Sequence, residues 1–166
     1  IVFCGLGNNG ADGIAIARLL NEKGIKTELC KVNELLSEKG TTTSSYKMQE
    51  EIYEAYRYPV QNDISEILKE EYDFVIDAIF GIGLSRPLNE DYMHIIQLIQ
   101  DVKGVKIAVD MPSGINADNG QIMGYALKCD YTITFSFAKL GQYIWPGCEY
   151  AGKVYIEDMG ITNASW

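Results

Sequence analysis

The sequence predicts an α/β fold built on an open, mostly parallel sheet. Three observations carry this prediction. Strand-like apolar runs alternate with segments whose apolar residues recur at helical spacing. The run Phe74–Ile76 is apolar without alternation, as in a strand covered on both faces. Three strands end in polar loops rich in glycine, asparagine or aspartate. Ligands of open parallel sheets bind at such strand ends.

The first unit is a strand that runs into a glycine-rich turn and then a helix. Residues 1–4 have the composition of a buried strand, the helix continues through Leu20, and Gly24 stands where a helix stop is expected. Later strands are predicted over residues 26–32, 72–80, 105–109, 129–135 and 153–157. Helices are predicted over residues 46–56, 64–69 and 91–102, and residues 33–39 form a short connection, helical or irregular. The 166 residues suit one domain.

The turn of this first unit has two interpretations. It matches G-x-G-x-x-G, which alone is a weak indication of dinucleotide binding. Asn8 and Asn9 fill its inner positions, and Asp12 falls at the cap or first turn of the predicted helix, where a carboxylate competes with a phosphate. This favours a cation or a polar ligand over a bare pyrophosphate. The alternative is a tight turn with left-handed asparagines and a capping Asp12.

The loop from Asp77 to Pro87 repeats this position at the end of another strand. A carboxylate at the end of an apolar strand needs a partner, so Asp77 requires a metal ion or hydrogen-bond donors. Gly81 and Gly83 allow the backbone to approach a ligand, and Arg86 is suited to a phosphate or carboxylate. Alternatively, Asp77 caps the loop and Arg86 lies in solvent.

A third polar loop follows the strand that ends at Val109. It begins with Asp110 and carries a hydroxyl at Ser113. Neighbouring parallel strands point their carboxyl ends the same way, so we expect Asn9, Asp77 and Asp110 at one edge of the sheet. Lys139 could reach this edge, but the usual behaviour of lysine predicts a structural or exposed side chain.

Composition excludes several classes of function. The net charge is -9, with 23 acidic and 14 basic residues, and no basic stripe reverses it locally. Nucleic acid and anionic membranes are therefore disfavoured as partners. No apolar run approaches the roughly 20 residues of a membrane span, and no secretory leader is recognisable. The four cysteines are scattered along the sequence and are expected to be reduced. His94 is the single histidine, which argues against a catalytic triad that contains histidine. We expect a cytoplasmic protein.

Taken together, the three loops closely resemble the YjeF N-terminal domain family, the NAD(P)HX epimerases. The matching motifs are N-N-G-x-D-G at residues 8–13, D-A-x-F-G-x-G-L-S-R-P at residues 77–87 and V-D-x-P-S-G at residues 109–114. They occur in the family's order and the resemblance spans nearly the whole chain. The chain departs from the pattern at Ala11, where the family usually has glycine, and in lacking the helical segment that precedes the first strand. The extra methyl group of Ala11 is expected to narrow the site.

The resemblance implies a Rossmann-like three-layer αβα sandwich over residues 1–166. It implies an isomerase that interconverts the R and S forms of hydrated NADH and NADPH, in nicotinamide nucleotide repair, with a bound potassium ion. Carried over by position, the potassium ligands are Asn9, Asp77 and Ser113. The substrate-binding residues are Asn8, Asn9, Gly10, Ala11, Asp12, Gly81, Ile82, Gly83, Leu84, Ser85, Arg86, Pro87 and Asp110. A homodimer, and a dehydratase as fused domain or partner, are also implied.

Asp110 is the residue expected to act as acid and base. It combines a strand-end position with an expected oxygen-rich, partly dehydrated setting, which suits a residue that exchanges protons. Two rival functions remain. A non-catalytic YjeF-like binding or scaffold module is disfavoured by the acidic balance and the intact loop residues. A conventional NAD-linked oxidoreductase needs an acidic residue that closes the second strand, yet Glu28 lies too early and Lys31 and Asn33 occupy the end.

Overall fold

A computed structural model describes residues 1–36 and 40–160 of the chain. Within this range lies a six-stranded sheet of order β2-β1-β3-β4-β5-β6, and every neighbouring pair is parallel. The strands are β1 (Val2–Cys4), β2 (Leu29–Lys31), β3 (Glu71–Ala78), β4 (Lys103–Val109), β5 (Tyr131–Phe135) and β6 (Lys153–Glu157). The predicted α/β class is therefore confirmed.

The helices connect these strands. They are α1 (Asn8–Glu22), α2 (Val32–Leu35), α3 (Ser44–Ala55), α4 (Ile64–Ile67), α5 (Glu90–Asp101), the 3-10 helix η1 (Leu140–Gln142) and α6 (Gly147–Ala151). The helices predicted over residues 46–56, 64–69 and 91–102 are present with slightly shifted ends. The connection predicted over residues 33–39 begins within α2, and its last three residues lie outside the described residues.

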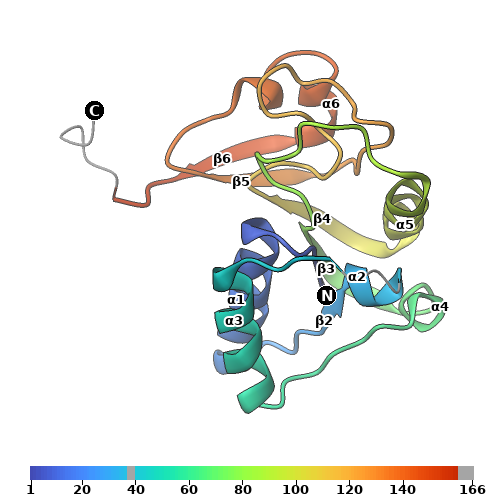
Figure 1. Cartoon of the computed structure of the whole chain (residues 1–166), viewed down its shortest axis with the longest axis vertical. Helices are drawn as coiled ribbons and strands as arrows, with labels where there is room; N and C mark the ends of the chain where they lie inside the picture. The colour runs from blue at the N-terminus through green and yellow to red at the C-terminus, as the bar shows by residue number, and fades with distance from the viewer. Residues whose placement is uncertain (37–39, 161–166) are drawn as a thin grey trace.

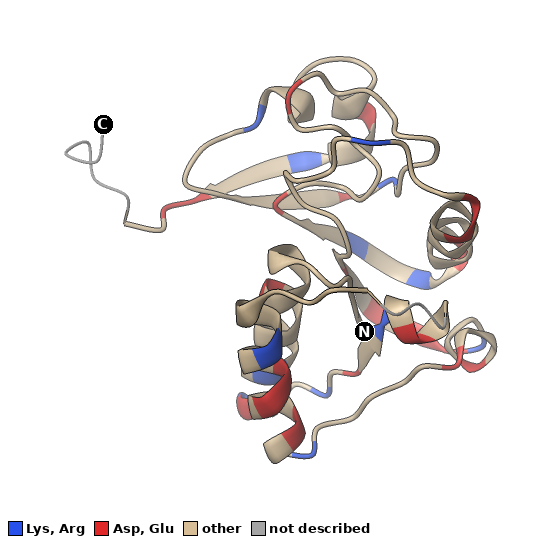
Figure 2. Cartoon of the chain, viewed as in Figure 1, with Lys and Arg blue, Asp and Glu red and all other residues tan. Residues whose placement is uncertain are grey.

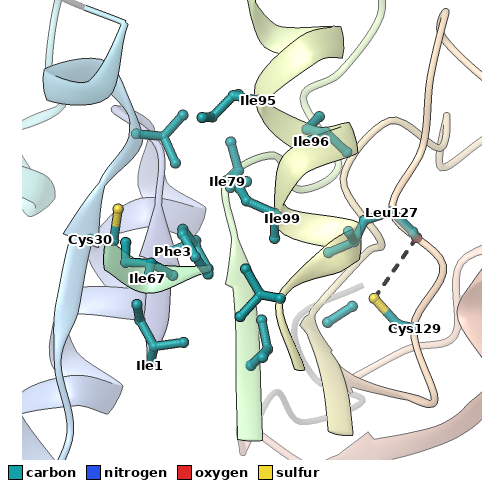
Figure 3. Close-up of a cluster of buried hydrophobic side chains, with 14 of the residues drawn as sticks. Ile1, Phe3, Cys30, Ile67, Ile79, Ile95, Ile96, Ile99, Leu127 and Cys129 are labelled. Carbon is teal, nitrogen blue, oxygen red and sulfur yellow. Dashed lines mark hydrogen bonds between the residues drawn. The ribbon is translucent and has the colours of Figure 1, made fainter. Parts of the chain in front are cut away.

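Two helical layers enclose the sheet, with α1 and α3 on one face and α2, α4 and α5 on the other (Figure 1). Alternation along the strands divides the core accordingly. Val2 and Cys4 belong to the cluster under α1 and α3, whereas Phe3 belongs to the cluster under α5. Figure 3 shows Phe3 in this second cluster with Ile67, Ile95 and other aliphatic side chains. The predicted three-layer sandwich is thus confirmed.

The strand predicted over residues 26–32 is shorter than expected. At its start, the side chain of Asn21 bonds to the backbone groups of Thr27. The Asn21 amide donates a hydrogen bond from Nδ2 to the Thr27 carbonyl at 2.9 Å, and its Oδ1 accepts one from the Thr27 N–H at 3.2 Å. Both backbone groups of Thr27 are thus bonded to a side chain in place of a neighbouring strand, and β2 begins only at Leu29.

The glycine-rich turn is a helix start, not a loop. Helix α1 begins at Asn8, with Gly7 as N-cap and no capping side chain, so Asp12 lies in the second turn and does not cap the helix. Glycine is required where the helix meets the sheet, since a Cβ at Gly10 would lie 1.8 Å from the Gly5 carbonyl oxygen. The prediction that Asp12 lies at the cap or first turn was wrong, because the helix begins earlier than the apolar periodicity indicates.

Charged residues are distributed over several elements (Figure 2). Acidic side chains are prominent on the helices, and the basic residues form no continuous stripe in the described part of the chain. None of the described helices has the length and apolar character needed to cross a membrane. The four cysteines are free thiols, and three of them are buried.

Candidate active site

Strands β1, β3 and β4 lie side by side, so the segments that follow them meet at one edge of the sheet. Hydrogen bonds join these segments directly. The Asn9 amide donates from Nδ2 to the Val109 carbonyl at 2.7 Å, and the Phe80 N–H donates to Ser113 Oγ at 2.9 Å. The start of α1 and the loops after β3 and β4 therefore form one continuous site, as expected from parallel strand geometry.

Asp77 is fully buried at the end of β3. Its carboxylate accepts hydrogen bonds from the Ser113 N–H at 2.7 Å, from Ser113 Oγ at 2.5 Å and from the Ile79 N–H at 3.2 Å. None of the described residues forms an ion pair with it. Burial raises the pKa of Asp77 to about 6, although the hydrogen bonds from Ser113 and Ile79 act in the opposite direction. The sequence predicted that Asp77 needs a metal ion or hydrogen-bond donors. The structure supplies donors, and all of them are neutral groups.

Asn9 presents a buried oxygen to this site. Its Nδ2 is used by the Val109 carbonyl, and its Oδ1 is buried without a hydrogen-bond donor among the described residues. A buried acceptor without a partner costs roughly 1–3 kcal/mol. A donor or cation at this point would remove that cost.

The oxygen atoms of this cluster suit a hard cation. Asn9 supplies an amide oxygen, Asp77 a carboxylate that lacks a positive partner, and Ser113 a hydroxyl oxygen that accepts one hydrogen bond and retains a lone pair. The described residues contain no group of three or more His, Cys, Asp and Glu side chains that could hold a metal ion. The donor set therefore differs from those of zinc and other transition metals and resembles an oxygen site for a hard cation.

Asp110 follows β4 and differs from Asp77 in its partners. The ammonium Nζ of Lys139 lies 2.5 Å from Asp110 Oδ1, Thr134 Oγ1 lies 2.9 Å from the same oxygen, and the Phe135 N–H lies 3.3 Å from it. The Gln142 amide donates to the Asp110 backbone carbonyl at 2.7 Å. The φ angle of Asp110 is 68°, in the left-handed region that aspartate adopts at a cost.

Lys139 reaches this edge of the sheet, the alternative that the usual behaviour of lysine made the less expected one. Only 18% of its side chain is exposed, and its ammonium also donates to Thr134 Oγ1 at 2.9 Å and to the Phe135 carbonyl at 3.1 Å. Sequence reasoning also missed Thr134 and Gln142 as partners of Asp110. One signal was available: Thr132 and Thr134 alternate with apolar residues in β5, and both are fully buried, so this strand presents a polar face to the interior.

The remaining predicted substrate residues flank this cluster. Asn8, Asp12 and most of the loop over residues 81–87 are exposed, and Arg86 makes no hydrogen bond or ion pair with the described residues. Burial raises the pKa of Asp12 above its ordinary value, and the negative charge of Asp110 raises it further. Ala11 is 4% exposed and packs in the cluster under α1. Its methyl group is in the core, so the predicted narrowing of the site by Ala11 was wrong.

Two cavities can be compared with this arrangement. A groove of about 390 Å³ runs between α1 and the sheet, is lined mainly by Ile16, Ile107 and Phe135, and includes Asp12 and Val109. A cavity of about 580 Å³ is lined by Ile1, Glu71 and other residues at the amino ends of β1 and β3. Of these two, only the first is lined by Val109, the residue before Asp110.

The chain matches a known family model and is similar in sequence to known proteins. The family model for YjeF-related protein N-terminus matches residues 1–141. The chain is 40% identical over 161 residues to the NAD(P)H-hydrate epimerase of Limosilactobacillus fermentum, covering 96% of this chain and 74% of that protein. It is 38% identical to the enzyme of the same name from Oenococcus oeni, covering 97% of this chain and 74% of that protein.

A longer relative and a solved structure extend the comparison. The bifunctional NAD(P)H-hydrate repair enzyme Nnr of Thermofilum pendens is 37% identical over 98% of this chain and 32% of its own length. The crystal structure of the yeast protein ynu0, YNL200c, has a TM-score of 0.73 at 23% identity and covers 95% of this chain and 65% of that one, which supports the fold. With a family model over most of its length and relatives of this similarity, the chain belongs to the YjeF-related protein N-terminus family.

Proposed function

We propose that this protein is an isomerase that interconverts the R and S epimers of hydrated NADH and hydrated NADPH. Two relatives that are 40% and 38% identical to this chain are named NAD(P)H-hydrate epimerase, and the chain covers almost three quarters of their length. One structural observation carries the proposal: two carboxylates stand at the ends of neighbouring strands. Asp77 has no cationic partner among the described residues, whereas Asp110 is bonded to Lys139.

The substrate is proposed to lie across the start of α1 and the loop after β3. Asn8 and Asp12 are exposed polar groups, as is Arg86, whose guanidinium is free to bind a phosphate in bidentate fashion. Ile82 and the glycines beside it leave the backbone of this loop accessible. The groove beside Asp12 offers an apolar surface that includes Val109, the residue before Asp110, and Phe135, whose N–H lies 3.3 Å from Asp110 Oδ1.

A potassium ion is proposed to bind among Asn9, Asp77 and Ser113. The buried Oδ1 of Asn9 and the raised pKa of Asp77 support this assignment, because a cation would give the first a partner and would stabilise the charged form of the second. When bound, the ion would supply the positive charge that balances Asp77 and would link α1 to the two loops.

Asp110 is proposed to move the proton that epimerisation requires. The hydroxyl on the ring carbon next to the nitrogen inverts either by leaving and returning on the opposite face or by opening and closing the ring. In the first route the protonated form of Asp110 gives its proton to the departing oxygen, which leaves as water, and the resulting carboxylate takes a proton from the water that adds to the opposite face. In the second it removes the hydroxyl proton as the carbon–nitrogen bond breaks and returns it on closure. General acid–base catalysis of this kind contributes about 10²–10⁴-fold to a rate.

The direct test is an assay with a single purified epimer of hydrated NADH or NADPH, followed by chromatographic separation of the two epimers. We expect the protein to bring them to equilibrium, and to do so several-fold faster in potassium than in sodium. With a binding or scaffold module, the epimer ratio would change no faster than in the protein-free control. An oxidoreductase would change the nicotinamide absorbance only with a second substrate.

Three further assignments accompany this proposal. A homodimer and cooperation with a dehydratase fit a repair enzyme, and a relative named as bifunctional matches this chain over about a third of its own length. A cytoplasmic location fits four free cysteines, since thiols persist in reducing compartments. Size-exclusion chromatography with light scattering and fractionation of cells test these assignments.

A further inference from the structure

The two oxygens of the Asp110 carboxylate have different environments. Oδ1 accepts hydrogen bonds from Lys139 Nζ, Thr134 Oγ1 and the Phe135 N–H. Oδ2 accepts none from the residues that the structure describes. The Asp110 N–H donates to the Ile133 carbonyl at 2.8 Å, so the backbone is held as well. One oxygen is therefore fixed to β5 and the other is available to a ligand.

The ammonium of Lys139 has no donor left for a substrate. A lysine ammonium has three N–H groups. These match the three acceptors around it, which are Asp110 Oδ1 at 2.5 Å, Thr134 Oγ1 at 2.9 Å and the Phe135 carbonyl at 3.1 Å. The backbone N–H of Lys139 donates to Gln142 Oε1 at 2.8 Å, which fixes the start of η1. Lys139 therefore acts through Asp110 and not on the substrate directly.

We propose that Lys139, together with Thr134, is the positioning residue of the reaction: it anchors Asp110 through Oδ1 and leaves Oδ2 to exchange the hydroxyl proton with the substrate. This inference rests on the proposed epimerase function. A charged hydrogen bond is shorter and stronger than a neutral one, and Lys139 and Asp110 are both mostly shielded, with 18% and 13% of their side chains exposed. The pair therefore restricts the carboxylate more than a solvent-exposed ion pair would.

The test is the Lys139→Met variant, which keeps an unbranched side chain of similar length and removes the charge. We expect kcat for epimerisation to fall on the order of 10²-fold, the scale of a misplaced catalytic group, while KM changes less than about twofold. Ethylamine added to Lys139→Ala should restore part of kcat, because it can enter the space left by the side chain. Lys128→Met removes an exposed lysine that forms no ion pair with the described residues, and it should match the wild type.

A purely structural role gives a different result. Thermal unfolding would then begin at a lower temperature, kcat per folded molecule would be unchanged and ethylamine would have no effect, which would overturn the inference. Should Lys139→Met not fold, Lys139→Arg keeps the charge. Its planar guanidinium cannot place three donors on the same three acceptors, so we expect kcat to fall at least about tenfold. A folded Arg variant with wild-type kcat would also overturn the inference.

The activity of the wild-type protein distinguishes a failure of the proposed function from a failure of the proposed role of Lys139. A wild-type protein that leaves the epimers unequilibrated overturns the proposed function and this inference with it. An active wild type with an equally active, folded Lys139→Met variant overturns the role of Lys139 alone.

Discussion

Asp77 and Asp110 stand at the ends of adjacent strands, yet their surroundings differ in one decisive respect. Asp77 is fully buried and has only neutral donors from Ser113 and Ile79. Asp110 is at the edge of the site and is bonded to the ammonium of Lys139. The same residue type at the same position in the sheet is therefore prepared for two tasks. Asp77 is suited to receive a cation, and Asp110, whose charge is already balanced, is suited to move a proton.

The largest effect is expected from Asp110→Asn. The amide cannot accept and return the substrate proton, so kcat should fall by about 10²–10⁴-fold while ligand binding persists. Epimer chromatography measures the rate, and calorimetric titration with NADPH as a nucleotide probe measures binding. Asp118→Asn alters an exposed carboxylate in the connection after β4 and serves as the control. A normal rate in Asp110→Asn would show that Asp110 does not transfer the proton. The proposed difference in role between Asp110 and Asp77 would then be wrong.

The next effect concerns the stability of the protein in the absence of potassium. The pKa of Asp77 is raised from 3.8 to about 6 in the folded chain, so the folded state holds its proton more tightly than the unfolded state does. Stability from this group is complete below pH 4 and is lost as pH rises through 6, by about 3 kcal/mol in all. Adding potassium above pH 6 should restore stability, because the cation favours the charged carboxylate.

Asp77→Asn isolates this contribution. The variant should lose both the decline between pH 4 and 6 and the response to potassium, as measured by urea unfolding in potassium and in sodium buffers. Asp73→Asn, an exposed acid on the same strand, should keep both. If the unfolding curves of wild type and Asp77→Asn respond equally to potassium, the cation does not bind at Asp77.

The smallest effect is expected from Ser113→Ala. The substitution removes a donor to Asp77 and leaves the Phe80 N–H without its acceptor, which should cost roughly 1–3 kcal/mol of unfolding free energy. Ser45→Ala, at an exposed position in α3, is the matched control. Because the Ser113 backbone still donates to Asp77, potassium binding should weaken without disappearing. Complete loss of the potassium response would show that the hydroxyl is a principal ligand.

The sequence predicts the sheet and its ligand edge because these follow from local patterns. Apolar runs such as Phe74–Ile76 identify strands, and parallel strands carry their following loops to one edge whatever the details of packing. The start of α1 was not predictable in this way. In the sequence Gly10 indicates a turn, but in the fold it lies within α1 and permits close contact with the Gly5 backbone, just after β1.

The partnership of Asp110 and Lys139 also lay beyond local reasoning. The two residues are 29 positions apart, and they meet only because β5 pairs with β4 and η1 returns toward the edge of the sheet. Lysine is usually solvated, so its type alone favoured a structural or exposed side chain over a place at the site. The specific hydrogen bonds depend on tertiary pairing, whereas the gathering of polar residues at strand ends does not.

The left-handed backbone conformation of Asp110 lowers the stability of the folded protein at a position that the proposed reaction needs. Glycine tolerates a φ angle of 68° without the steric cost that any side chain incurs there. Asp110→Gly is accordingly a substitution that would relieve local tension while removing the carboxylate. Keeping an acid at this position sacrifices some resistance to unfolding in exchange for a carboxylate at the end of β4, where the proposed reaction needs it.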